Sequence, residues 1–153
     1  MNQARKLKIL GLMSGTSMDG LDLCLAEIDI TENYLFNYNI LKSISESFNP
    51  STKSIIDSAV NGKNIHLAHK QLGKLFSELC IKHFSSENID AIAMHGQTIA
   101  HIDGEMTQQI GDPQYLAASF QIPIIYNFRQ ADIDAGGNGA PLMPFLDWLL
   151  FRN

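Results

Sequence analysis

A short run of small and polar residues near the start of the chain has the composition of a phosphate-binding turn. It follows an apolar stretch over residues 7–13, and its residues are Gly15, Thr16, Ser17, Met18, Asp19, Gly20, Leu21 and Asp22. The glycines let the backbone turn tightly and approach a ligand, so that N–H groups and the Thr16 and Ser17 hydroxyls could point at phosphate oxygens. No lysine follows Gly20, and a strand rather than a helix is expected next, so this is neither a Walker loop nor a dinucleotide fingerprint. A purely structural hairpin turn is the alternative.

Asp19 is the residue of this loop that a plain hairpin explains least. A carboxylate beside a phosphate is tolerable only if a cation lies between them, which predicts that Asp19 positions Mg²⁺, directly or through water. The alternative interpretation is an Asx-type turn, in which the Asp19 side chain bonds only to the nearby backbone.

A second polar group, His95-Gly96-Gln97-Thr98, is expected where an apolar strand over residues 89–94 ends. The carboxyl ends of parallel strands open onto the crevice in which α/β proteins bind ligands, and polar side chains there can hydrogen-bond sugar hydroxyls. We therefore predict that Gln97 and Thr98 contact a sugar. His95 fits either a ligand contact or a packed structural residue.

A third group follows a short apolar strand over residues 122–126. It contains Arg129 and Asp132, followed by Asp134 and the glycine-rich stretch 136–142. An arginine directly after a buried strand can bind a carboxylate through two N–H groups, so we predict that Arg129 and Asp132 contact the substrate. A structural ion pair between Arg129 and Asp132 is the alternative.

The elements that would position these groups are strands followed by alternating helices and strands. Apolar or alternating runs predict strands at 7–13, 21–30, 34–40, 89–94 and 122–126, a hairpin around Asp103-Gly104 between 98–101 and 107–110, and helices at 51–60, 65–82 and 113–120. Ser51 is the predicted cap of the first helix. Leu21, Leu23 and Leu25 alternate with other apolar residues, which predicts a strand covered on both faces.

The predicted fold class is therefore α/β. The order of elements matches a ribonuclease H-like lobe of the actin-like ATPase kind, with a mixed sheet in which an antiparallel β-hairpin is followed by parallel strands and covering helices. The chain of 153 residues, 45% of them hydrophobic, suffices for one globular domain.

Charge and hydropathy restrict the partners. A net charge of −5 with scattered Lys and Arg residues offers no basic face for a nucleic-acid backbone. The apolar run near the start is too short for a signal peptide, and no run approaches the roughly 20 apolar residues of a membrane span. We expect a cytoplasmic protein with small-molecule partners. Cys24 and Cys80 each lie in an apolar stretch, which favours buried thiols over a disulfide or a metal site.

Several blocks of the sequence occur in the order found in one kinase family. They are Gly-Leu-Met-Ser-Gly-Thr-Ser-Met-Asp-Gly at 11–20, His-Gly-Gln-Thr at 95–98, Gln-Ile-Gly-Asp at 109–112, Phe-Arg at 128–129 and Gly-Gly-Asn-Gly-Ala-Pro-Leu at 136–142. With these blocks the chain resembles the N-terminal part of the anhydro-N-acetylmuramic acid kinase family, and the resemblance spans essentially the whole chain.

The resemblance implies an ATP-dependent enzyme that phosphorylates O6 of 1,6-anhydro-N-acetylmuramic acid while water opens the anhydro ring, giving the 6-phosphate in peptidoglycan recycling. It also implies that the loop from Gly15 to Asp22 contacts the phosphates of ATP with Mg²⁺ at Asp19, and that Thr98 and Arg129 face the sugar. A homodimer is a further expectation for the full-length protein.

The family's general base belongs to a later Asp-Thr-Gly-Pro-Gly block, which nothing in this sequence matches. We therefore expect residues 1–153 to form the N-terminal lobe, with the second lobe and the general base outside it and negligible activity for the isolated chain. The apolar segment 144–151 is expected to pack against whatever follows it. Two alternatives are another actin-like sugar kinase and a non-catalytic module that binds a partner through this apolar end.

Overall fold

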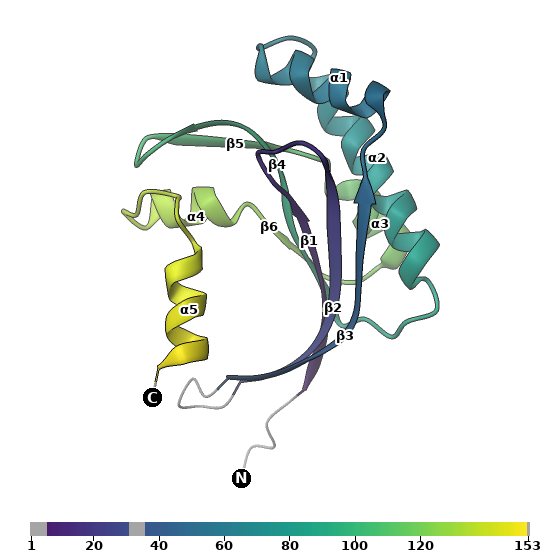
Figure 1. Cartoon of the computed structure of the whole chain (residues 1–153), viewed down its shortest axis with the longest axis vertical. Coiled ribbons are helices and arrows are strands. Elements are labelled where there is room, and N and C mark those ends of the chain that lie inside the picture. The colour runs from purple at the N-terminus through teal and green to yellow at the C-terminus, as the bar shows by residue number, and fades with distance from the viewer. Residues whose placement is uncertain (1–5, 31–35, 153) are drawn as a thin grey trace.

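The strands and helices of the computed structural model follow the predicted alternation. The structure describes residues 6–30 and 36–152. The strands are β1 (Leu7–Ser14), β2 (Gly20–Ile30), β3 (Phe36–Ser47), β4 (Ala91–Ile102), β5 (Met106–Ile110) and β6 (Ile124–Tyr126) (Figure 1). The helices are α1 (Pro50–Val60), α2 (Ile65–Phe84), α3 (Gln114–Phe120), α4 (Phe128–Asp134) and α5 (Met143–Phe151). Among the described residues, no helix combines the length and the apolar character needed to cross a membrane.

The strands form one mixed sheet in the order β3-β2-β1-β4-β5, with β6 as a further partner of β4. The first three strands pair antiparallel, β4 runs parallel to β1, and β6 runs parallel to β4. Along one edge of β4, β6 pairs with the first half and β5 pairs antiparallel with the second half. An antiparallel hairpin followed by parallel strands and covering helices confirms the predicted ribonuclease H-like fold class.

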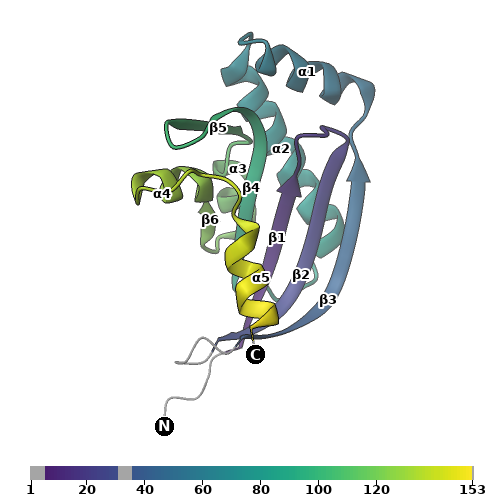
Figure 2. The ribbon, with the colours of Figure 1, turned by 60° about the vertical axis from the view of Figure 1, so that its left-hand side comes forward.

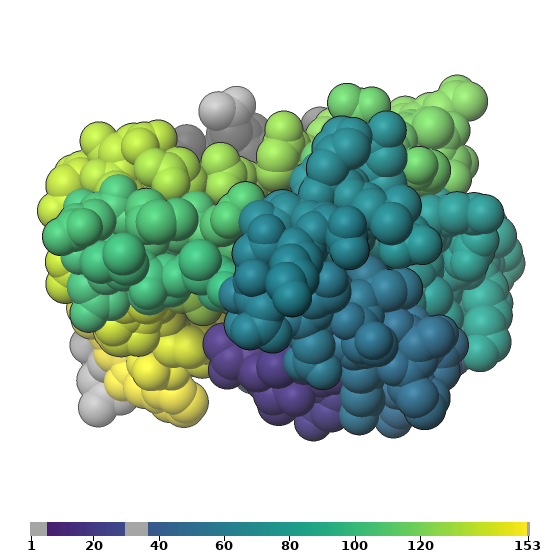
Figure 3. All heavy atoms as spheres, turned by 90° about the horizontal axis from the view of Figure 1, so that it is seen from above, coloured from purple at the N-terminus to yellow at the C-terminus, as the bar shows by residue number. Residues whose placement is uncertain are grey.

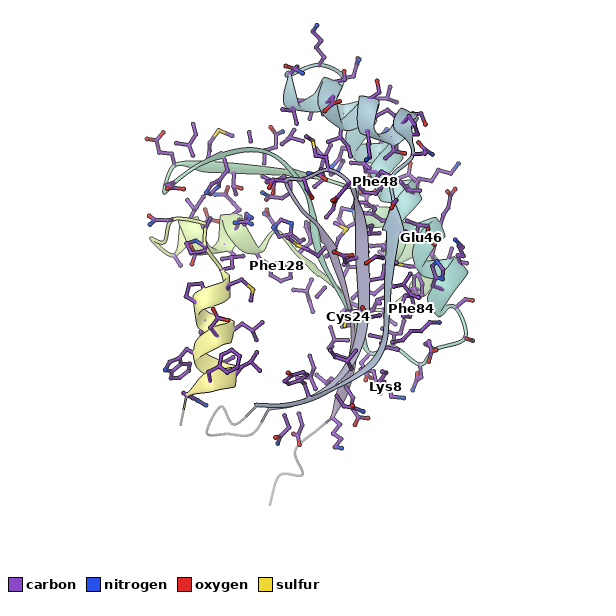
Figure 4. All side chains as sticks on the ribbon, in the orientation of Figure 1. Lys8, Cys24, Glu46, Phe48, Phe84 and Phe128 are labelled. Carbon is purple, nitrogen blue, oxygen red and sulfur yellow. The ribbon has the colours of Figure 1, made fainter. Side chains whose placement is uncertain are left out.

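The hydrophobic core lies between the sheet and helices α1, α2 and α3, which cover the same face (Figure 2). Alternate leucines of β2 point into it, and α2 contributes apolar side chains spaced three or four residues apart, as an amphipathic helix requires. Figure 4 shows Phe48 and Phe84 on this helix-covered side, whereas Phe128 lies on the other side with α4.

The other face of the sheet is only partly covered, so the prediction that β2 is buried on both faces is wrong. Cys80 is a buried thiol, as expected, and burial raises its pKa to about 12. Cys24, in contrast, lies on the open face of β2 and is partly exposed. Tyr38 and Ile40 of β3 are exposed. Helices α4 and α5 lie on this side of the sheet but leave much of the face uncovered (Figure 1).

One local prediction was wrong, and two elements differ in extent from what the sequence indicated. The side chain of Asn49, not Ser51, caps α1 by accepting a hydrogen bond of 2.8 Å from the Thr52 N–H. Residues 128–134, to which the sequence assigned no helix or strand, form helix α4. Strand β3 also continues to Ser47, seven residues beyond the predicted end, because an edge strand tolerates polar side chains along its exposed face.

The group His95-Gly96-Gln97-Thr98 lies inside a strand, not at the end of one. Two separate strands were predicted around it, but β4 runs unbroken from Ala91 to Ile102 because β5 takes over from β6 as its neighbour. The parallel partners of β4 do end beside this group, β1 at Ser14 and β6 at Tyr126. The carboxyl ends of the neighbouring parallel strands therefore lie beside this group, although β4 itself continues past it.

Candidate active site

Gln97 ties the glycine loop between β1 and β2 to strand β4. Its side chain is 0% exposed, and its Oε1 lies 2.6 Å from the hydroxyl oxygen of the equally buried Ser14. Its Nε2 donates hydrogen bonds of 3.1 Å to the backbone carbonyls of Gly15 and Thr98. The amide of Gln97, predicted to contact a sugar, is thus engaged within the protein and holds the first residues of the loop.

A bulge at Gly96 turns Gln97 toward the loop. Leu12 and Ser14, two residues apart on β1, face Met94 and Gln97, three residues apart on β4, so β4 carries one extra residue here. Gly96 has a φ of 77°, a conformation that residues with a Cβ rarely adopt. Gln97 therefore shares the core face with Met94, and His95 projects on the other side.

The loop itself is a tight turn with an exposed tip. The Met18 N–H donates to the Gly15 carbonyl at 3.1 Å, and the Phe48 N–H donates to the Asp19 carbonyl at 2.8 Å, which packs the loop against the start of α1. Thr16 and Ser17 are exposed. Figure 3 shows the purple, N-terminal part of the chain, to which this loop belongs, at the surface of the molecule. Leu21 points into the core, so its side chain is not available to a ligand.

Asp19 is exposed and ionised at neutral pH. Its Oδ1 accepts a hydrogen bond of 2.8 Å from the Ser17 hydroxyl, and this bond, the backbone N–H groups and the nearby Lys53 hold the pKa of Asp19 below its ordinary value. Asp19, Asp22 and Ser45 are among the residues that line a depression of about 240 Å³. Lys53, in the first turn of α1, carries no signal in the sequence that would have associated it with the loop.

A metal site built from protein side chains alone is absent from residues 6–30 and 36–152, where no three His, Cys, Asp or Glu residues are grouped to hold an ion. Asp19 by itself fits the way Mg²⁺ binds in phosphate-transfer sites, where one or two carboxylates and the phosphates of the nucleotide share the ion. The role of Asp19 toward Mg²⁺ stays a prediction.

Arg129 and Asp132 bind the same glycine from two sides. The Nη1 of Arg129 donates to the Gly139 carbonyl at 2.8 Å, and the carboxylate of Asp132 accepts from the Gly139 N–H at 2.8 Å. The Nε of Arg129 donates to Nε2 of His95 at 2.9 Å. The alternative of a direct ion pair between Arg129 and Asp132 is therefore wrong, and the third sequence group is held together by backbone contacts instead.

The two halves of the site meet at β4. His95 accepts a hydrogen bond from Arg129. The backbone of Ser14, where the glycine loop begins, also acts on His95 and raises its pKa against the larger, opposite effect of desolvation. Thr98 is half-buried, and its hydroxyl accepts a hydrogen bond of 3.3 Å from Gln109 of β5. A cavity of about 170 Å³ lies beside His95 and is lined in part by His69, Gln109 and Tyr126.

A ribonuclease H-like sheet with a glycine loop between its first two strands defines the chain as an α/β protein of the actin-like kinase class. The family model described as anhydro-N-acetylmuramic acid kinase matches residues 7–153, and the chain belongs to this family.

Relatives carrying the name anhydro-N-acetylmuramic acid kinase match nearly all of this chain. The protein of Clostridioides difficile is 38% identical, over 94% of this chain and 42% of the relative. That of Caldanaerobacter subterraneus is 34% identical, over 95% of this chain and 41% of the relative. That of Francisella tularensis subsp. novicida is 32% identical, over 94% and 42% respectively. The chain thus spans about two-fifths of the length of these curated relatives.

Proposed function

We propose that this chain is the N-terminal lobe of a cytoplasmic, ATP-dependent kinase that acts on 1,6-anhydro-N-acetylmuramic acid. The reaction phosphorylates O6 while water adds to the anomeric carbon and opens the anhydro ring, giving N-acetylmuramic acid 6-phosphate. The family match over residues 7–153 supports this reaction. The observation that carries the proposal is the Gln97 side chain, which joins the glycine loop to the second sequence block and so makes one site of two motifs.

In this proposal the loop from Gly15 to Asp22 cradles the phosphates of ATP with its backbone N–H groups and the hydroxyls at its exposed tip. The ionised Asp19 is one ligand of Mg²⁺, which neutralises phosphate charge when it is bound. Lys53 lies close enough to Asp19 to add positive charge beside the phosphates.

The residues on the other side of β4 form the sugar-binding part of the proposed site. Thr98 and Arg129 contact it, while Asp132 acts through the Gly139 N–H that it binds. Gln97 takes the role of a positioning residue for the loop, since both ends of its amide are engaged within the protein. The carboxylate that activates water belongs to a second lobe outside residues 1–153, and the complete protein is proposed to be a homodimer.

The isolated chain of residues 1–153 is expected to show negligible turnover, because loss of a general base alone costs about 10²–10⁴ in rate. The measurement is ADP release from ATP and the anhydro-sugar, for the purified chain and for the complete protein that its gene encodes. Comparable turnover by both would contradict the assignment of a single lobe. Turnover of another sugar but not of the anhydro-sugar by the complete protein would favour the alternative of a different actin-like kinase.

Replacing Asp19 by asparagine in the complete protein is expected to lower kcat/KM for MgATP by about tenfold or more, equivalent to about 1.4 kcal/mol of transition-state binding. The reason is that asparagine keeps the shape of the side chain but removes the charge that the cation needs. Steady-state kinetics at several Mg²⁺ concentrations give the measurement, and the variant should require more Mg²⁺.

The matched control is Asp57→Asn, which removes an exposed carboxylate from the surface of α1. Its kinetics should equal those of the unmodified protein. If Asp19→Asn and Asp57→Asn behave alike, Asp19 has no part in handling the nucleotide.

A further inference from the structure

The partners of His95 define its protonation state. Its Nδ1 lies 2.8 Å from the carbonyl oxygen of Gly96, which can only accept a hydrogen bond. Its Nε2 lies 2.9 Å from Nε of Arg129, which can only donate one. The ring satisfies both partners in one form alone, the neutral imidazole with its proton on Nδ1 and a free lone pair on Nε2.

The same contacts restrict what Arg129 can offer to a ligand. Its Nε donates to His95 and its Nη1 donates to the Gly139 carbonyl, so two of the five N–H groups of the guanidinium are already used. In the part of the chain that the structure describes, Nη2 has no protein partner. Arg129 can therefore donate to a ligand oxygen through Nη2, whereas the fork that pairs Nε with Nη2 on a carboxylate is not available, because the single N–H of Nε is already used.

Gly139 is the other end of this chain of contacts. It is buried, its carbonyl is held by Arg129, and its N–H is held by Asp132. The contacts thus run from strand β4 through helix α4 to the glycine-rich segment 136–142. Loss of the acceptor on His95 would leave the guanidinium free to rotate away from Gly139.

We propose that His95 is a positioning residue, whose neutral Nδ1-protonated ring fixes the Arg129 guanidinium so that Nη1 holds Gly139 and Nη2 is presented to the sugar. The identity of the sugar rests on the proposed function, whereas the positioning of Arg129 and Gly139 does not.

The electrostatic surroundings keep the ring in this neutral form. Desolvation in the half-buried site, and the charge of Arg129, hold the pKa of His95 below its ordinary value, against the opposing effect of the Gly96 and Ser14 backbone. Among the residues that line the adjoining cavity with it, His69 of α2 and Tyr126 of β6 are also titratable. Protonation would place a second donor opposite Nε of Arg129. Because the folded-state pKa is lowered, this stabilising arrangement is present above the unfolded pKa of about 6.5 and is lost as the pH falls.

Two measurements on the chain of residues 1–153 need no substrate. Long-range ¹H–¹⁵N NMR at about pH 7.5 should show the Nδ1–H form for the His95 ring, which a His95→Gln variant identifies among the histidines; the Nε2–H form, which is intrinsically favoured in water, would overturn the proposal. Hydrogen exchange of the Gly139 N–H should accelerate by about tenfold or more in His95→Phe, which keeps the ring but has no acceptor. It should change little in His95→Gln, whose amide can both accept and donate.

Kinetics of the complete protein complete the test. In His95→Phe, KM for the anhydro-sugar should rise about tenfold with KM for ATP unchanged, and His95→Gln should restore it to within about threefold. If His95→Phe leaves both the exchange of Gly139 and the sugar KM unchanged, the positioning role is wrong. If the Gly139 exchange responds as expected but the unmodified complete protein does not use the anhydro-sugar, the positioning of Arg129 stands and the proposed function fails.

Discussion

Replacing Gln97 by leucine is expected to lower the free energy of unfolding of the chain by about 2–4 kcal/mol. Leucine fits the volume, but it leaves the carbonyls of Gly15 and Thr98 without the amide that now donates to them. Together with the hydrogen bond that Gln97 accepts from the Ser14 hydroxyl, three side-chain hydrogen bonds are lost, each contributing about 0.5–1.5 kcal/mol. Urea unfolding followed by circular dichroism gives the measurement, since a stability change shifts the midpoint without changing the slope.

The control for this substitution is Gln114→Leu, at the exposed start of α3, which should change the stability by no more than about 0.5 kcal/mol. Equal midpoints for the two variants would show that the Gln97 amide does not hold the loop. In the complete protein, Gln97→Leu should also raise KM for ATP, because the loop it anchors is the proposed phosphate site.

Replacing Gly111 by alanine is expected to cost about 2–5 kcal/mol of stability for two reasons. The backbone has a φ of 120° there, so an alanine is strained by about 1–2 kcal/mol. In addition, a Cβ would lie 2.7 Å from Cε2 of Phe76, whose side chain is 0% exposed within the core. Overpacking of this kind typically costs about 1–3 kcal/mol.

Gly62→Ala separates the two causes. Gly62 also has a positive φ, 75°, but no atom lies within 4 Å of the Cβ that alanine would add. Only the backbone strain of about 1–2 kcal/mol should appear in this variant. Urea midpoints of the two variants should therefore differ, and a Gly111→Ala variant no less stable than Gly62→Ala would mean that the Phe76 ring yields.

The elements that depend on local spacing were predictable from the sequence. The apolar positions of α2 recur every three or four residues, and the leucines of β2 alternate. In each element this spacing predicts which face is buried. The small and polar composition of residues 14–20 likewise predicts the turn between β1 and β2. Prediction from the sequence was incomplete or wrong where local preference is weak. Helix α4 has only seven residues, so its apolar spacing is too short to indicate a helix. At the start of α1, Asn49 and Ser51 are both suitable caps, and the backbone geometry selects Asn49.

By itself, the sequence determined the family, the fold class and the loop, because motif order and hydrophobic period are properties of neighbouring residues. Only the tertiary structure decided that the Gln97 side chain bonds to the loop while the His95 side chain bonds to Arg129. In a regular strand these two side chains would share one face, and it is the extra residue at Gly96 that separates them. Their partners lie 83 and 34 residues away along the chain, a separation that only the packing of β1 and α4 against β4 removes.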